Sequence, residues 1–438
     1  MNPGSEVHTR GCAFFRPLLA AAALLACASP SSVPAAPATP SSATPVGVAT
    51  PVNSRLAAMS PPNRARSFQR MSEYFPTRMI ARAGSIDPLP HGRPGVAELE
   101  FEFEGQRHSV NEFFERNHTS GMVVLDAGSL AYERYRPGTG PNTRFTSFSM
   151  AKSITSTLVG LAMGDGAIES VDDPLTKYIA DLEGTAYDGV TIKQALQMSS
   201  GVAFSETYTD PKADIHVFTG LSMLQNKVPA NELVRRFERA ARPGTVFNYS
   251  TGETQVLVWL VRAATGKAPA AYLSEKIWSR IGMEHDATWI LDRDGGMEMG
   301  GIGIDATVRD YARFGQLMAN DGVWREERIL PEGWVKEATT PVEPHLDYGK
   351  LVRTPLEGYQ YQWWALPGED TAYVAQGVFG QLLYINPARN VVIAKLSTWP
   401  RGTDPRLKGE AFAAFDAIAK HLASQRADRT AEVGADRE

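Results

Sequence analysis

Cysteine is almost absent from this chain of 438 residues, which contains only Cys12 and Cys27. Both precede residue 30, so the folded part has no disulfide, no cysteine-based zinc site and no catalytic cysteine. The eight histidines are scattered singly, without an H-E-x-x-H sequence or a pair at metal-ligand spacing. We therefore expect neither a metal nor another cofactor.

An excess of charge of one sign is also lacking, since 44 Lys and Arg face 49 Asp and Glu, for a net charge of −5. This balance disfavours a polybasic protein, and we expect no nucleic acid partner. Beyond the N-terminal region no apolar run reaches the ~18 residues of a membrane span, which excludes a multi-span membrane protein. With 43% hydrophobic residues, the chain can bury a sizeable core, either as a few ordinary units or as one large domain with an insertion.

The first 28 residues have the pattern of a secretory signal peptide. Arg10 and Arg16 come before a short apolar run that ends at Cys27, and small residues follow. The L-L-A-C sequence ending at Cys27 resembles a bacterial lipobox and makes Cys27 a lipidation candidate, whereas Ala26 to Ala28 also fits an ordinary cleavage site. We expect an exported protein, either periplasmic or anchored in the membrane only through a lipid on Cys27.

Composition divides the rest of the chain into three parts. Residues 29–68 are rich in proline, alanine and serine and predict a flexible linker, because closely spaced prolines prevent a helix or a sheet ladder. Residues 69–424 predict the folded domain. Residues 425–438 form a polar tail that we expect to be frayed.

Hydrophobic periodicity predicts strands near both ends of the domain and helices between them. The predicted strands are 99–103, 121–126, 130–135, 359–364, 373–376, 381–385 and 391–396. The predicted helices are 146–163, 192–198, 230–241, 253–264, 270–281, 307–319 and 410–422. This order favours an α/β (α+β) fold in which one antiparallel sheet comes from both chain ends and an all-α lobe is inserted.

One S-x-x-K sequence, Ser149 to Lys152, stands near the start of the helix predicted at 146–163. The i, i+3 spacing puts hydroxyl and ammonium on one helix face, and the helix N-terminus presents free N–H groups. A buried lysine with a lowered pKa can take the proton of a serine nucleophile. The same pattern also occurs by chance around surface lysines. No G-x-S-x-G elbow competes with it, and the glycine pattern 301–306 predicts a turn and not a dinucleotide site.

Three further motifs follow in order: T-I-K-Q-A-L-Q-M-S-S-G-V at 191–202, P-G-T-V-F-N-Y-S at 243–250 and Q-G-V-F-G-Q at 376–381. Together with T-S-F-S-M-A-K-S at 146–153 they resemble the serine β-lactamase and penicillin-binding-protein superfamily. The pattern is most similar to class C-like esterases and 6-aminohexanoate-dimer (nylon-oligomer) hydrolases. The resemblance spans residues 70–422 and implies a β-lactamase/transpeptidase-like fold.

The resemblance also implies catalytic roles. Ser149 would be the acylated nucleophile, Lys152 its proton acceptor and Tyr249 the proton relay to the leaving group. The backbone N–H groups of Ser149 and Val378 would form the oxyanion hole. Beside a cationic Lys152 the phenolate of Tyr249 would be favoured, so that the pair shares one proton.

Substrate contacts are implied less specifically. The nylon-oligomer hydrolases bind the amide with a loop tyrosine and a tryptophan, for which Tyr208 and Trp363 or Trp364 are the candidates. Gly377 and Phe379, at the third motif, complete the expected substrate site. The loop carboxylate of these hydrolases has two candidates, Asp210 and Asp214.

Two departures bear on specificity. Thr251 stands where β-lactamases usually have asparagine, and Ala375-Gln376-Gly377 replaces the usual Lys-Thr-Gly or His-x-Gly. We therefore expect an exported, metal-free serine hydrolase that cleaves a small linear amide or ester through an acyl-enzyme. The alternatives are a D-alanyl-D-alanine carboxypeptidase or β-lactamase, and a sensor on the same fold that binds without turnover. The oligomeric state is left open.

Overall fold

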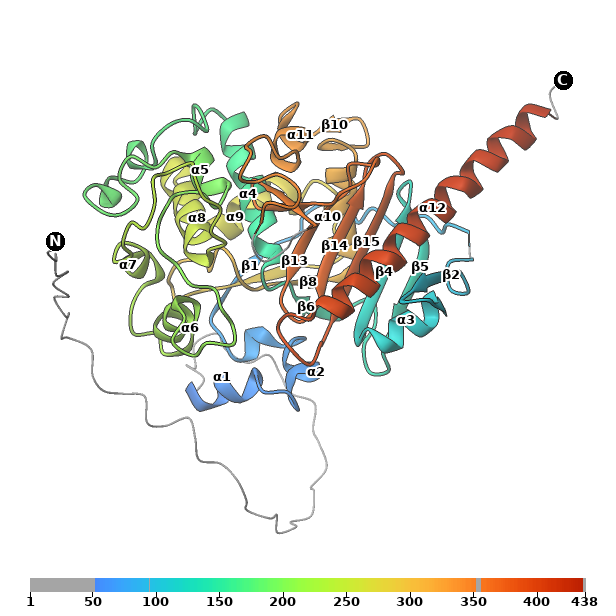
Figure 1. Ribbon diagram of the computed structural model, residues 1–438, viewed down its shortest axis with the longest axis horizontal. Coiled ribbons are helices and arrows are strands. Elements are labelled where there is room, and N and C mark those ends of the chain that lie inside the picture. The colour runs from blue at the N-terminus through green and yellow to red at the C-terminus, as the bar shows by residue number, and fades with distance from the viewer. Residues whose placement is uncertain (1–51, 94, 352–355, 436–438) are drawn as a thin grey trace, which may run out of the picture. The chain divides into compact units, whose positions relative to one another are not determined.

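A seven-stranded antiparallel sheet carries strands from both ends of the domain, as predicted (Figure 1). The computed structural model describes residues 52–93, 95–351 and 356–435, so that the predicted signal and Cys27 lie outside the described residues. The order is β11-β12-β13-β14-β15-β4-β5. The strands are β4 (Thr119–Asp126), β5 (Ser129–Tyr135), β11 (Gly358–Gln360), β12 (Trp363–Ala365), β13 (Tyr373–Gly377), β14 (Gln381–Asn386) and β15 (Val391–Ser397).

Helices cover both faces of this sheet, which explains why β4, β14 and β15 are apolar on both sides. Helix α10 (Val308–Ala319) packs against β4, β14 and β15 on one face. Helices α3 (Val110–Arg116) and α12 (Pro405–Ala435) pack on the other, where Phe113 and Phe415 meet edge to face.

The α-helical lobe lies between the two groups of strands in the sequence. Its helices are α4 (Met150–Gly164), α5 (Ile192–Leu196), α6 (Asp214–Thr219), α7 (Ala230–Val234), α8 (Thr251–Thr265) and α9 (Pro269–Leu273), with single π-turns at Gly220–Leu224 and Ser274–Trp278. Ser250 caps α8 by accepting from the Glu253 N–H, and Gly266 ends it at φ +69°. Helices α4 and α8 pack together and are almost entirely buried.

A second sheet fixes the segment that precedes α4. Its order is β1-β7-β8-β6, formed by β1 (Thr77–Ile80), β7 (Ala287–Ile290), β8 (Ile304–Thr307) and β6 (Arg144–Thr146). Directly after β6, Ser147 Oγ accepts from the Ile304 N–H at 3.0 Å. Further elements of the domain are α11 (Trp334–Thr339) and two small hairpins, β2 (Glu100–Phe103) with β3 (Gln106–Ser109), and β9 (Val323–Trp324) with β10 (Glu327–Arg328).

Two predicted elements are wrong in detail. The helix predicted over 230–241 ends at Val234, before Phe237 turns into the core. The strand predicted over 359–364 is the hairpin β11–β12, whose turn residues Tyr361 and Gln362 both have positive φ. The tip is held inside the lobe, because Gln362 Nε2 donates to the Leu196 carbonyl at 2.9 Å.

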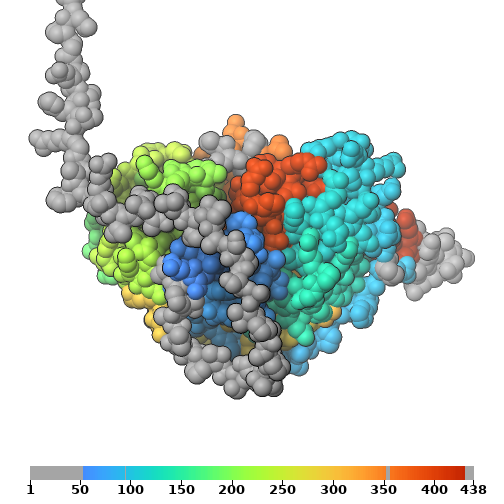
Figure 2. Space-filling model, turned by 90° about the horizontal axis from the view of Figure 1, so that it is seen from below, coloured from blue at the N-terminus to red at the C-terminus, as the bar shows by residue number. Residues whose placement is uncertain are grey.

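The predicted boundaries of the linker and the tail are also wrong. Residues 52–67 contain α1 (Val52–Ala58) and α2 (Arg64–Ser67), and Arg55 is buried, donating to the carbonyls of Met223 and Leu224. Arg64 donates to the Pro400 carbonyl at 2.8 Å. Figure 2 shows this blue segment between the green lobe and the red end of the sheet.

At the other end of the domain, α12 continues to Ala435, beyond the helix predicted at 410–422. Residues of the expected tail are therefore helical. Within the described residues no helix is both long enough and apolar enough to span a membrane.

Candidate active site

Ser149 and Lys152 meet at the start of α4. Ser149 is the N-cap residue and is 8% exposed, whereas Lys152 is 1% exposed. Lys152 Nζ lies 3.0 Å from Ser149 Oγ and 2.9 Å from Thr251 Oγ1. The residue before the nucleophile candidate, Phe148, has φ +43°, a sparsely populated conformation that turns the chain from β6 into α4.

Gly301 completes the surroundings of the lysine. Its carbonyl accepts from Lys152 Nζ at 3.3 Å, and a Cβ atom at this position would lie 2.9 Å from Nζ. Of the glycine-rich segment 301–306, the first three residues form the expected turn and the rest belong to β8, which begins at Ile304. The absence of a side chain at Gly301 lets the backbone approach the lysine.

The environment favours a neutral Lys152. Burial lowers its pKa to about 8, because desolvation disfavours the ammonium form. Glu206 acts in the opposite direction, with its Oε1 4.0 Å from Lys152 Nζ. At pH 7 about a tenth of the molecules therefore carry a free amine beside the Ser149 hydroxyl, and this amine can accept the hydroxyl proton.

Glu206 is a buried carboxylate that sequence reasoning missed. It is 2% exposed and accepts from the Thr251 N–H at 2.7 Å, from Thr251 Oγ1 at 2.8 Å and from the Tyr208 hydroxyl at 2.6 Å. Thr251, whose presence departs from the β-lactamase pattern, accepts from Lys152 and donates to Glu206. The threonine thus links the lysine to the carboxylate.

Tyr249, just before α8, faces the same pair. Its ring centroid lies 5.0 Å from Lys152 Nζ. Burial raises the pKa of Tyr249, nearby Glu206 raises it further, and a hydrogen bond with Ser149 only partly opposes them. The direction of this shift is opposite to the expected phenolate and favours a neutral phenol at Tyr249, which can donate a proton.

Tyr208 approaches Ser149 from the loop that carries Glu206. Its ring is half-buried, and its pKa is raised well above the ordinary value by burial and by Glu206, with a hydrogen bond to Ser149 opposing. The structure thus brings Tyr208 and Tyr249 to the Ser149–Lys152 pair, although both tyrosines lie far from that pair in the chain.

The end of β13 lies directly against the turn that carries Ser149. A Cβ at Gly377 would lie 2.3 Å from the Ser147 carbonyl oxygen and 3.2 Å from the Ser149 nitrogen, so only glycine permits this approach. The pairing between β12 and β13 ends at Val374, which leaves the edge from Ala375 to Gly377 outside that ladder. An extended substrate can dock against such an edge.

Comparison with known proteins agrees with this geometry. The family model described as Beta-lactamase matches residues 106–417. The chain belongs to the β-lactamase family. It is 30% identical to the 6-aminohexanoate-dimer hydrolase of Paenarthrobacter ureafaciens over 346 residues, covering 77% of this chain and 86% of that protein. The relatives in this family are hydrolases, and the family is one of serine hydrolases.

Two further proteins are similar to this chain, one by comparison of structures and one by comparison of sequences. A Bacillus anthracis structure, provisionally assigned as a 6-aminohexanoate-dimer hydrolase, superimposes with a TM-score of 0.76 at 27% identity, covering 84% of this chain and 96% of that one. A provisionally assigned D-alanyl-D-alanine carboxypeptidase of Escherichia coli K12 is 21% identical over 295 residues, covering 57% of this chain and 68% of that protein.

The two tryptophan candidates for substrate binding lie on opposite faces of β12. Trp364 is half-buried, and its ring lies 5.4 Å from that of Tyr249. Trp363 points to the other face of β12, where it is fully buried between Phe314 and Tyr373. Only Trp364 is in position to contact a substrate beside Tyr249.

The other candidates from the sequence have different positions. Phe379, at φ +63°, packs with Phe148 and with an arginine, Arg64, whose guanidinium lies 4.3 Å from its ring centre, so it forms a wall beneath the nucleophile turn. Asp210 is exposed in a turn, and Asp214 accepts from the Ser205 N–H at the start of α6. Among the described polar contacts of Lys152 neither aspartate appears, and the carboxylate near its ammonium is that of Glu206.

Proposed function

We propose that this protein hydrolyses a small linear amide or ester through an acyl-enzyme on Ser149. The observation that carries the proposal is the buried Lys152, whose Nζ lies 3.0 Å from Ser149 Oγ and whose pKa is lowered to about 8. A serine hydroxyl needs a base to become a nucleophile, and the neutral amine of Lys152 supplies one.

In the acylation step, Lys152 Nζ takes the hydroxyl proton while Ser149 Oγ bonds to the substrate carbonyl carbon. The carbonyl oxygen becomes an oxyanion, stabilised by the N–H groups of Ser149 and Val378. Tyr249 donates its phenolic proton to the leaving nitrogen as the C–N bond breaks, and it recovers a proton from Lys152. The neutral phenol of Tyr249 suits this acid role.

In the deacylation step, a water attacks the ester carbonyl of the acyl-enzyme. The neutral amine of Lys152 accepts the proton of the water, which it later returns to Ser149 Oγ, and the same N–H pair holds the second oxyanion. The ester bond breaks, Ser149 recovers its proton and the carboxylic acid product leaves. Glu206 touches neither substrate nor nucleophile in this scheme; it positions Thr251 and Tyr208 and sets the charge around Lys152.

The open edge of β13 and its neighbours favour an extended, partly apolar substrate. Trp364 offers an apolar wall beside Tyr249, and Tyr208 supplies a hydroxyl near Ser149 that can bond to a substrate amide. The relative from Paenarthrobacter ureafaciens is named for the 6-aminohexanoate dimer, a linear amide. We infer the same class of substrate here.

β-Lactams should be poor substrates. Their carboxylate is usually held by a lysine or histidine at the third motif, where this chain has Ala375, buried at 1% exposure. Loss of a charge-assisted hydrogen bond costs about 1.5–3 kcal/mol. The similarity to a carboxypeptidase makes a cell-wall peptide the second candidate for the substrate.

The proposal is tested by kcat/KM for three substrates: a 6-aminohexanoate dimer, a medium-chain nitrophenyl ester and nitrocefin. Continuous turnover of the dimer or ester, abolished in Ser149→Ala, is the expected result. Release of one equivalent of product per chain, with no further turnover, would instead identify a sensor. Nitrocefin turnover at or above the rate for the ester would favour the β-lactamase alternative.

We also propose that the protein is exported through residues 1–28, on the strength of the signal pattern and the lipobox-like sequence at Cys27. Palmitate labelling in a bacterial host should be present in the wild type and lost in Cys27→Ser. A wild type that is secreted without label would contradict lipidation, and retention in the cytoplasm would contradict export.

A further inference from the structure

A chain of polar contacts runs from α12 to the third motif. Lys408 Nζ, on the second turn of α12, lies 2.8 Å from Glu357 Oε2. The other carboxylate oxygen of Glu357 accepts from Gln376 Nε2 on β13. Glu357 is 3% exposed, whereas the Lys408 and Gln376 side chains are partly exposed.

These contacts fix which end of the Gln376 amide is engaged. A carboxylate paired with an ammonium only accepts hydrogen bonds, so the NH₂ group of the amide must face Glu357. The carbonyl oxygen of the amide, Oε1, accepts no hydrogen bond from any of the described residues. A glutamine held this way offers an acceptor, not a donor, to a ligand.

Gln376 lies on the leaving-group half of the proposed site. Gln376 and Val374 lie on one face of β13, because strand residues alternate. Val374 pairs with Trp364, and Trp364 packs against Tyr249, the proposed proton donor to the leaving nitrogen. The next residue, Gly377, abuts the Ser149 nitrogen.

We propose that Gln376, oriented by the Glu357–Lys408 ion pair, is a specificity-determining residue that accepts a hydrogen bond from an N–H donor on the leaving-group half of the substrate. An ammonium or amide donor near the scissile bond satisfies Oε1, whereas a carboxylate meets a second acceptor and gains no hydrogen bond. The inference rests on the proposed function, and it names amines and diamines as preferred leaving groups over amino acids with a nearby carboxylate.

The test uses three hexanoyl amides, made from propane-1,3-diamine, 3-aminopropanoic acid and butylamine. They place an ammonium, a carboxylate or a methyl group at a similar distance from the scissile nitrogen. In the wild type, kcat/KM for the ammonium amide should exceed that for the carboxylate amide by about 10- to 100-fold, the worth of a charge-assisted hydrogen bond. The difference should appear mainly in KM.

Glu357→Gln releases the amide of Gln376 and leaves the Lys408 ammonium unpaired, so the ammonium-to-carboxylate ratio should fall to about one or invert. Gln376→Met removes the acceptor without touching the buried ion pair, and the ratio should fall there too. Glu343→Gln is the matched control: its carboxylate precedes β11 and pairs with Lys193 at 3.8 Å, and the ratio should stay at the wild-type value.

A wild-type ratio near one, or a ratio unmoved in both Glu357→Gln and Gln376→Met, would overturn the inference while leaving Ser149-dependent hydrolysis intact. Absence of Ser149-dependent hydrolysis of every amide and ester would overturn the proposed function, and this inference with it. Circular dichroism of each variant shows whether Glu357→Gln folds. If it does not, Gln376→Met decides the result alone.

Discussion

At the scale of single residues, the pKa of Lys152 sets the pH dependence of the proposed reaction. Only the neutral amine can accept the Ser149 proton, so kcat/KM should rise as pH increases through about 8 and level off above it. Removing the charge of Glu206, which raises the pKa of Lys152, should shift this rise to lower pH in Glu206→Gln. The measurement is a pH–rate profile with a neutral ester.

Asp210→Asn is the control for this profile, because it removes an exposed carboxylate from the same loop. Its profile should match that of the wild type. A shift in Asp210→Asn without one in Glu206→Gln would assign the loop carboxylate to Asp210 and contradict the present account.

Tyr249 provides a second prediction at this scale. Tyr249→Phe keeps the ring beside Trp364 and removes the proton donor, so amide hydrolysis should fall by about 10²–10⁴-fold. Hydrolysis of nitrophenyl esters should fall less, since nitrophenolate leaves without a proton. Tyr359→Phe is the matched control: that ring packs against Tyr249, is fully buried and has a hydroxyl without a hydrogen-bond partner among the described residues. If the rates of amide and ester hydrolysis fell equally, the role of Tyr249 would be structural only.

At the scale of elements, the contact between β13 and the turn before α4 depends on Gly377. Gly377→Ala puts a methyl group 2.3 Å from the Ser147 carbonyl oxygen, so the strand end must move away from Ser149. A displacement of about 1 Å in a catalytic site costs on the order of 10²-fold in rate, and we expect kcat/KM to fall by that factor. Gly140→Ala, whose methyl group would meet open space, should have wild-type activity. Full activity in Gly377→Ala would contradict the proposed oxyanion geometry.

The long elements were predictable because their own periodicity identifies them. Helices α4, α8 and α10 and the hairpin β4–β5 begin and end within a few residues of the predictions, since each has a continuous apolar face. The hairpin β11–β12 was missed because its turn, Tyr361-Gln362, has positive φ without glycine or asparagine. Its conformation is imposed by the lobe that binds Gln362, which no local pattern reveals.

The site was predictable to the extent that it lies in motifs. Ser149, Lys152 and Tyr249 come from sequences with fixed spacing, and the structure brings them together. Glu206 has no such spacing to the lysine, 54 positions away in the chain, and only the tertiary contact at 4.0 Å reveals it. Arg55 was assigned to a linker because the surrounding segment is rich in proline, and its contacts with the lobe are made to residues far away in the chain.

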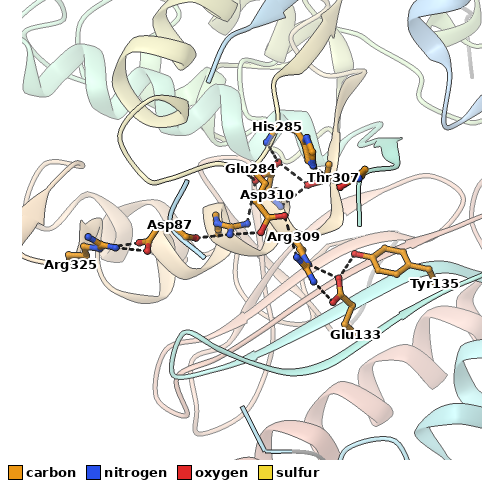
Figure 3. Close-up of polar contacts among 11 residues, drawn as sticks. Asp87, Glu133, Tyr135, Glu284, His285, Thr307, Arg309, Asp310 and Arg325 are labelled. Carbon is orange, nitrogen blue, oxygen red and sulfur yellow. Dashed lines mark hydrogen bonds and ion pairs between the residues drawn. The ribbon is translucent and has the colours of Figure 1, made fainter. Parts of the chain in front are cut away.

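At the scale of the whole domain, a network of ion pairs joins β5, α10 and the loop before β7 (Figure 3). Arg313 is fully buried and pairs with Glu284 at 2.6 Å and with Asp310 at 3.4 Å. Figure 3 shows Arg309 bound to Glu133 on β5 in the same network. The network lies on elements other than those that carry Ser149 and Tyr249, so we assign it a structural role.

Arg313→Met should lower the free energy of unfolding by about 3–5 kcal/mol, because it leaves the buried Asp310 carboxylate without its cation and leaves Glu284 paired with Arg309 alone. Arg325→Met is the control, since the exposed Arg325 pairs with Asp87 (Figure 3) and a surface pair contributes about 0–1 kcal/mol. Urea denaturation measures both. Similar values for the two variants would mean that the buried network adds little stability.

The central claim, that Ser149 is acylated with Lys152 as its base, is tested most directly by intact-protein mass spectrometry with a fluorophosphonate, followed by peptide mapping. The account predicts one adduct per chain, located on Ser149, absent in Ser149→Ala and formed far more slowly in Lys152→Ala. An adduct that persists on another serine in Ser149→Ala, or unchanged labelling in Lys152→Ala, would contradict it.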